Sequence, residues 1–180
     1  MNTKDIVYIA LFAAITAGLG ILPFIKVPIS PVPVTAQSLG LMLAGSILGP
    51  KRGALSQILF LGLVTLGLPI LAGGNGGIGI LLGPSGGFLL GWPIGAFIIG
   101  LLFKKKWASL TPTTAFTYMV VGGILVVYAI GTLWLSLVVK ISLTKAWVGS
   151  MVFIPGDIAK ALIGTTTAMA VKGAYPIIKN

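Results

Sequence analysis

The residues most able to do chemistry in this sequence are Asp157 and Lys160, which lie three positions apart inside a long apolar run. Asp157 is one of only two acidic residues among 180. On a helix, positions i and i+3 share a face, so the carboxylate and the ammonium would point into one space. A charge near the centre of a membrane costs at least about 2.5 kcal/mol. We therefore expect this pair to bind a ligand; the alternative is a structural ion pair that neutralises itself.

The composition predicts an all-α integral membrane protein with a single transmembrane domain over residues 1–180. The chain is 57% hydrophobic and 8% charged, with a mean hydropathy of +1.11. A soluble domain is usually about a quarter charged. The net charge of +10 comes from lysines that stand singly or as the run 104–106 between apolar spans. Such loops are typical of the inner membrane face, so the lipid bilayer is the expected environment and nucleic acid is not an expected partner.

Several residue types are missing, and their absence argues against catalysis. The sequence has no His, Cys or Glu. This removes thiol chemistry, soft metal sites and Cys or His nucleophile–base pairs. The other acid, Asp5, lies at the N-terminus, so the relay of intramembrane acids found in many proton-coupled pumps is missing as well. We expect no enzyme activity, no cofactor and no metal.

Apolar runs predict six transmembrane helices. Their approximate ranges are 5–25, 36–50, 53–72, 86–103, 113–138 and 147–172. The second run is short and follows a Pro-rich stretch, so it spans by tilting or is partly re-entrant. Pro155 fits the first turn of a helix, which would then begin near Gly156, with residues 147–154 as its lead-in.

The distribution of basic residues predicts that both termini are cytoplasmic. With six spans, eight basic residues fall on the side of the termini and three on the other, and Lys160 remains inside. The eight are Lys4, Lys51, Arg52, Lys104, Lys105, Lys106, Lys172 and Lys179; the three are Lys26, Lys140 and Lys145. A cleaved signal peptide over residues 1–22 is the alternative for the first span, but no clear cleavage site ends this run.

Three segments fall on the outer side, and we expect them to converge on a polar pocket towards the outer leaflet. They are the Pro-rich loop 27–35, the Gly-rich loop 73–79 with its continuation 83–87, and the start of the last helix at 155–157. The loop GNGGIG matches the G-x-G-x-x-G fingerprint by letter, but no strand–helix unit or ribose-binding acid accompanies it. We interpret Gly74 and Gly76 as backbone that approaches a ligand closely, with the Asn75 amide as donor and acceptor; a flexible loop is the alternative.

Small residues recur at four-residue spacing, which allows helices to approach closely. Most of these stripes, including Gly87, Gly91 and Gly95, are expected to serve internal packing. The stripe of Ala10, Ala13, Ala14 and Ala17 is the best candidate for docking a partner helix, because apolar residues flank it. The four tryptophans, at 92, 107, 134 and 147, lie near predicted span ends and suggest an interfacial belt, although Trp134 and Tyr128 are also candidates to face a pocket.

Several motifs in order along the chain resemble the BioY family, the biotin-specific substrate-binding (S) components of energy-coupling-factor (ECF) vitamin transporters. The motifs are VPVTAQSL at 32–39, LGPKRGA at 48–54, GLP at 67–69, AGG at 72–74, LGPSGG at 82–87 and PGDIAK at 155–160. The resemblance implies six membrane helices, a biotin site near the extracellular side, and assembly with a transmembrane T protein and two cytoplasmic ABC ATPases. It also implies that the alanine stripe docks the T protein. The chain has no P-loop motif of its own.

Biotin would suit the candidate ligand-binding residues, which are Asp157, Lys160, Asn75, Gly74, Gly76, Gln37 and Tyr128. Asp157 would accept hydrogen bonds from the urea N–H groups, and Asn75 would complement the urea edge. Lys160 would either pair with the tail carboxylate or orient Asp157. The expected function is capture of biotin from outside, in the plasma membrane of a bacterium. The alternatives are an S component for another vitamin, a self-sufficient carrier or channel in which Asp157 handles a proton or cation, and an assembly protein that binds no small molecule.

Overall fold

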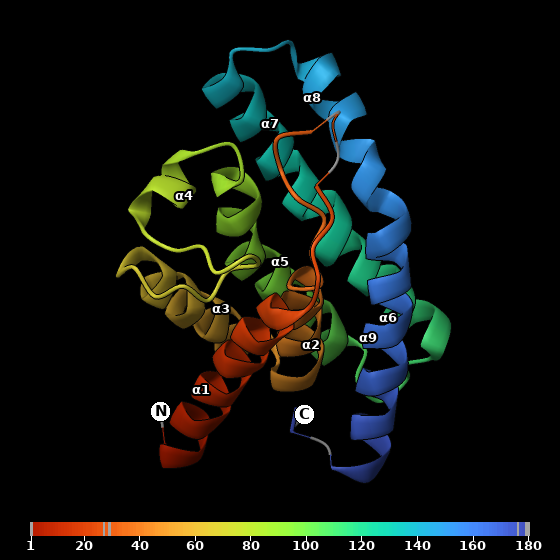
Figure 1. Cartoon of the computed structure of the whole chain (residues 1–180). Coiled ribbons are helices and arrows are strands. Elements are labelled where there is room, and N and C mark those ends of the chain that lie inside the picture. Colours follow the sequence, from red (N-terminus) through yellow and green to blue (C-terminus); the bar gives the residue numbers. More distant parts are fainter. Residues whose placement is uncertain (1, 27, 29, 176, 179–180) are drawn as a thin grey trace.

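A computed structural model of the chain describes residues 2–26, 28, 30–175 and 177–178 and is helical throughout (Figure 1). These residues contain no β-strand, only two isolated bridges, which join Ile25 to Val34 and Leu71 to Asn75. The elements are α1 (Thr3–Gly18), η1 (Leu19–Ile21), α2 (Ser38–Leu48), α3 (Pro50–Thr65), α4 (Ile78–Leu82), α5 (Gly86–Lys105), α6 (Pro112–Val120), η2 (Val121–Val126), α7 (Val127–Val139), α8 (Leu143–Ser150), η3 (Met151–Phe153) and α9 (Ile154–Ala174).

Helix α5 lies at the centre of the bundle, in contact with α2, α3 and α7. Small residues on α5 make this close packing possible. A Cβ atom added at Gly95 would lie 2.5 Å from the carbonyl oxygen of Gly122, and one added at Gly87 would overlap the Cβ of Trp134. The glycine stripe of α5 therefore serves internal packing, as expected from the sequence.

Four helical segments of the described chain are long and apolar enough to cross a membrane: Thr3–Ile21, Gly86–Lys105, Pro112–Val139 and Leu143–Ala174. The remaining two predicted spans contain α2 and α3, with 11 and 16 residues. At 1.5 Å per residue these helices are about 16 and 24 Å long, which is short of a hydrocarbon core of about 30 Å. The count of six spans therefore stays a prediction.

The boundaries differ from the predicted ranges in two places. Helix α3 ends at Thr65, well before the predicted end at residue 72, because Gly67 turns the chain with a φ of 95°. The predicted lead-in at 147–154 is itself helical, since the end of α8 and η3 occupy it, and α9 begins at Ile154, slightly before Gly156. Pro155 stands in the first turn of α9, as its fixed φ and missing N–H favour.

Helices α6 and α7 are joined without a break by η2, a π-helical segment from Val121 to Val126. Such segments are rare in α-helices and often occur near functional sites. Gly122 and Gly123 lie in this segment, close to Ile99 and Met42 respectively, so the wide turn is packed against the core. The π-helix directly precedes Val127 and Tyr128, and thereby sets how these side chains are presented.

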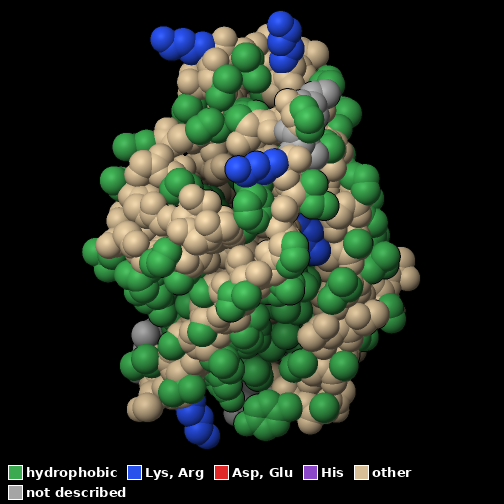
Figure 2. Space-filling model, in the orientation of Figure 1, with side chains coloured by type: hydrophobic (Ala, Val, Ile, Leu, Met, Phe, Trp, Pro, Cys, Tyr) green, Lys and Arg blue, Asp and Glu red, His purple; other side chains and the backbone are tan. Residues whose placement is uncertain are grey.

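Helix α1 begins and α9 ends at the same end of the molecule, while the turn between α7 and α8 lies at the opposite end (Figure 1). Arg52 joins the segments near the two termini, because its guanidinium donates to Asp5 Oδ1 and to the carbonyl of Ile177, each at 3.3 Å. Figure 2 shows a face made mostly of hydrophobic side chains and backbone, with basic side chains at both ends and near the middle. The abundance of hydrophobic side chains on this face is typical of a protein that lies in lipid.

Candidate ligand-binding site

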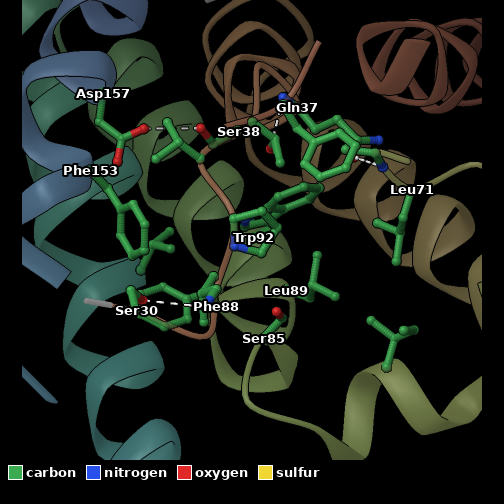
Figure 3. A pocket seen from close by; sticks show the side chains of 18 of the residues that line it. Ser30, Gln37, Ser38, Leu71, Ser85, Phe88, Leu89, Trp92, Phe153 and Asp157 are labelled. Carbon is green, nitrogen blue, oxygen red and sulfur yellow. Dashed lines mark hydrogen bonds between the residues drawn. The ribbon is translucent and has the colours of Figure 1, made fainter. Parts of the chain in front are cut away.

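A cavity of about 570 Å³ lies where the three predicted segments meet, and this size suits a small organic ligand. The Pro-rich loop contributes residues 30–35, the Gly-rich loop and its continuation Asn75 and Ser85, and the last helix Asp157 and Lys160. Leu71 and Ala72, directly before the Gly-rich loop, line the cavity as well. Figure 3 shows the Asp157 carboxylate directed towards Ser38 at one side of the cavity, with the rings of Phe153, Phe88 and Trp92 nearby. The convergence expected from the sequence is therefore present in the structure.

Asp157 is 5% exposed and is held by three side chains from three different elements. Its Oδ1 forms an ion pair with Lys160 Nζ at 2.6 Å and accepts from the Ser38 hydroxyl at 3.1 Å, and its Oδ2 accepts from the Tyr128 hydroxyl at 2.5 Å. An ionised carboxylate has about four acceptor positions. One position, on Oδ2, therefore remains for a donor from a ligand.

Lys160 lies one turn further along α9, and its ammonium group has three partners in the structure. It contacts Asp157, donates to the carbonyl oxygen of Thr35 at 2.7 Å, and donates to the Ser38 hydroxyl at 2.7 Å. Ser38 thus accepts from Lys160 and donates to Asp157. These contacts close a ring of three side chains and tie α9 to the N-terminus of α2. The two opposite charges make this end of the cavity electrically neutral.

Tyr128, 3% exposed, belongs to a cluster of three aromatic rings that lines the cavity next to the charged pair. Its ring meets Phe88 edge to face, with centroids 6.0 Å apart, and Phe153 at 6.5 Å. Phe88 and Phe153 are also edge to face, at 6.1 Å. Such arrangements stabilise aromatic pairs beyond their buried area. The cavity therefore has a polar corner beside a rigid apolar wall.

Gln37 also borders the cavity, but the backbone occupies its amide. The side chain is 1% exposed. Its Nε2 donates to the carbonyl oxygens of Thr16 and Ile70 at 3.1 and 3.0 Å, and its Oε1 accepts from the N–H of Ala72 at 2.8 Å. Gln37 thus fastens the Gly-rich loop to α1 and to the start of α2, so it positions the walls of the cavity.

The Gly-rich loop carries Asn75 on the lining of the cavity, with its Nδ2 donating to the carbonyl of Ala72 at 2.8 Å. Gly74, with a φ of 71°, gives the loop a left-handed turn, and Gly77 gives another with a φ of 93°. Gly76 allows close packing, since an added Cβ would overlap the carbonyl of Leu68. Neither Gly74 nor Gly76 is among the described residues that line the cavity, so they shape the loop around Asn75.

Many lining residues were not singled out as ligand-binding by sequence reasoning; besides Phe88 and Phe153, they include Ser38, Trp92 and Lys26. Ser38 completes the hydrogen-bond ring, but a serine at a helix start has no distinctive signal in a single sequence. Trp92 is 5% exposed, lies in mid-helix and stacks on Phe60 at 5.8 Å, so its assignment to an interfacial belt was wrong. Lys26 lines the cavity as well, although the sequence analysis counted it only among the basic residues of the loops. Trp134, the other aromatic candidate, instead donates to the carbonyl of Gly83 at 2.9 Å.

The alanines of α1 divide between two environments. Ala13 is 3% exposed and belongs to the hydrophobic core, and Ala17 is half-buried against it. Ala10 and Ala14 are exposed at the edge of the same stripe. A partner helix would therefore meet Ala10 and Ala14, while Ala13 is used inside the protein.

Comparison with known proteins assigns the whole chain to one family. The sequence model of the BioY family matches residues 1–177. A protein of Rhizobium etli called "Biotin transporter BioY" is 46% identical, over 99% of this chain and 98% of the relative. A "Probable biotin transporter BioY" of Bacillus subtilis is 39% identical, over 96% and 92% of the two chains. Among solved structures, an S-component for biotin from an ECF-type ABC transporter superposes with a TM-score of 0.91 at 36% identity, covering 96% of this chain and 95% of that one.

Proposed function

The chain belongs to the BioY family, and from this premise and the geometry of its cavity we infer that it is a biotin-binding S component of an ECF-type transporter. It is a multi-pass protein of the cell membrane, and its relatives are transporters rather than enzymes. The observation that carries the assignment of the site is the buried Asp157 carboxylate, which has one free acceptor position beside a wall of aromatic rings.

Biotin matches a cavity that has a polar corner at Asp157 and an apolar wall of aromatic rings. Its fused rings carry a urea with two N–H donors, and the rest of the bicycle is apolar. We propose that a urea N–H donates to Oδ2 of Asp157, because a hydrogen bond to a charged acceptor is roughly twice as strong as a neutral one. The rings of Phe88, Tyr128 and Phe153 would enclose the bicycle. An analogue without the urea would leave the carboxylate with an unmet acceptor and be rejected.

The remaining candidates take supporting roles in this proposal. Lys160 orients and neutralises Asp157, since its three N–H donors already have partners. Asn75 lines the cavity, and because its Nδ2 donates to Ala72, its amide oxygen would be the group that accepts from the ligand. Gln37 and the two glycines, Gly74 and Gly76, act by holding the loop that carries Asn75.

We further propose a single transmembrane domain with six spans and cytoplasmic termini, which captures biotin from the extracellular side. Two observations support this topology. The first and last helices reach the same end of the molecule (Figure 1). Basic residues are also concentrated at that end in the sequence pattern, although one of them, Lys179, lies outside the described residues. Helices α2 and α3 would then cross as short helices extended by their loops.

The proposed partners are a transmembrane T protein and two cytoplasmic ABC ATPases, which would supply the energy for transport. The exposed Ala10 and Ala14 on α1 support docking of a helix, because small side chains let two backbones approach closely within lipid. This docking role, like the count of ATPases, rests on the resemblance to the family.

Calorimetric titration of the detergent-purified protein with biotin tests the ligand directly. We expect saturable binding of one biotin per chain, with no competition from riboflavin or thiamine. Displacement of biotin by either vitamin would point to a different or broader S component. No heat of binding to a folded sample would remove biotin as the ligand.

A further inference from the structure

The hydrogen bonds of Lys160 leave the ligand's carboxylate without its expected partner. A lysine ammonium has three N–H donors. In this structure they meet Asp157 at 2.6 Å and the Thr35 carbonyl and Ser38 hydroxyl at 2.7 Å each. A ligand carboxylate could reach Lys160 only by displacing one of these partners, and it would then stand close to the negative Asp157. This inference rests on the proposed function, because it concerns the tail of the same ligand.

Lys26 is the second cation among the described residues that line the cavity, and its surroundings are different. It is exposed and directly follows Ile25, whose backbone pairs with that of Val34 through hydrogen bonds of 3.0 and 2.9 Å. This pairing fixes the backbone beside Lys26, and both Lys26 and Val34 line the cavity. The Lys26 Nζ lies 5.8 Å from the centre of the Phe24 ring. The ammonium group thus lies over an aromatic ring, and the residue remains exposed.

Lys26 also carries a charge that no aspartate neutralises. The chain has two acidic side chains, and both are engaged elsewhere. Asp5 pairs with Arg52 at 3.3 Å, and Asp157 pairs with Lys160. The cavity therefore has a buried neutral end, formed by the ion pair, and a hydrated positive end at Lys26. A carboxylate is far costlier to bury than a urea, so the tail should extend towards the hydrated end.

We propose that Lys26 recognises the carboxylate of the ligand tail and thereby makes the site selective for the acid over its neutral derivatives. Asp157 would bind the urea end of the ligand, and Lys26, at the exposed end of the cavity, would bind its carboxylate. The contribution is modest, because an exposed ion pair is weak and screened by salt. Lys26 therefore determines specificity for the tail, while Asp157 determines whether the ring system binds.

The test compares biotin with biotinamide, in which a neutral carboxamide replaces the carboxylate, on the full-length protein. For Lys26→Gln we expect the affinity for biotin to fall by up to about fivefold at low salt, the range of an exposed ion pair. The affinity for biotinamide should stay at the wild-type value. Lys26→Glu should weaken biotin further and again spare biotinamide. Lys145→Gln is the matched control, because Lys145 is an exposed lysine of α8 that is not among the described residues lining the cavity. It should leave the affinity for both ligands unchanged.

Two results would overturn the proposal. Equal losses for biotin and biotinamide in Lys26→Gln would make Lys26 a structural residue of the loop. A Lys160→Met variant that discriminates against biotin but not biotinamide would place the carboxylate at Lys160 instead. If the wild-type protein binds neither ligand, the proposed function itself fails, and this outcome is distinct from both. Thermal unfolding of each variant tests whether the substitution leaves the fold intact.

Discussion

Replacing Asp157 with asparagine changes the site at one atom position and removes its negative charge. Asparagine has nearly the same shape, so the cavity keeps its form. The ligand loses a hydrogen bond to a charged acceptor, which is worth about 1.5–3 kcal/mol. At about 1.4 kcal/mol per factor of ten, the dissociation constant for biotin should rise by roughly 10- to 150-fold.

The same substitution leaves Lys160 without its counter-charge in a partly buried position. Breaking a buried ion pair by removing one partner costs about 3–5 kcal/mol, although the Thr35 and Ser38 contacts of Lys160 remain and lessen this cost. The double variant Asp157→Asn with Lys160→Met removes both charges. It should therefore be more stable than Asp157→Asn alone and still fail to bind biotin tightly.

Calorimetric titration and thermal unfolding on the same detergent preparations separate loss of binding from loss of folding. Asp157→Asn should show a weak or undetectable biotin isotherm together with a cooperative unfolding transition. Ser142→Ala, which removes the exposed N-cap hydrogen bond of α8 to the Lys145 N–H, is a control for mild destabilisation away from the cavity. A folded Asp157→Asn protein that binds biotin as tightly as wild type would refute the assignment of Asp157 as the urea acceptor.

Three further predictions follow from the packing around the site. Gln37→Ala leaves the buried N–H of Ala72 and the carbonyl oxygen of Ile70 without their hydrogen-bond partner, so it should lower the free energy of unfolding by about 1–3 kcal/mol. It should weaken the binding of biotin and of biotinamide equally, as thermal unfolding and titration would reveal. Gly87→Ala should cost about 1–3 kcal/mol in thermal unfolding because α5 has no room for a methyl group there. Gly62→Ala, inside α3 and with no atom within 4 Å, should instead keep or raise the melting temperature, because alanine favours a helix more than glycine does; equal melting temperatures of the two variants would contradict the packing argument. Ala14→Leu should leave biotin binding intact and reduce co-purification with the T protein by about tenfold, given an overpacking cost of about 1–3 kcal/mol, and unchanged association would remove α1 as the docking helix.

The sequence predicts the parts of this protein that depend on polarity. Hydrophobic runs located the helices, and the isolated pair of Asp157 and Lys160 pointed to the cavity, because charges inside apolar segments are costly and few. The convergence of three loops also followed from alternation of the helices across the membrane. These inferences required only the spacing and sign of polar groups, which are visible along the chain.

Other features depend on three-dimensional contacts that leave no local signal. The amide of Gln37 is able to bind either a ligand or a loop, and only the positions of Thr16, Ile70 and Ala72 decide that it holds the loop. Tryptophan is a residue type common at membrane interfaces, but Trp92 lies in the core, because α5 packs so that its ring stacks on Phe60. The early end of α3 depends on the conformation of Gly67, which the apolar character of residues 66–72 conceals.

The pairing of Asp157 with Lys160 has an electrical consequence. Moving one unpaired elementary charge through the membrane potential requires about 2.3 kcal/mol per 100 mV. With the carboxylate and ammonium 2.6 Å apart, the polar end of the cavity carries no net charge. A displacement of this site along the membrane normal therefore does no electrical work on the pair. If the site changes its depth in the bilayer, any dependence of that movement on voltage would come from Lys26 and from the charge of the ligand rather than from this pair.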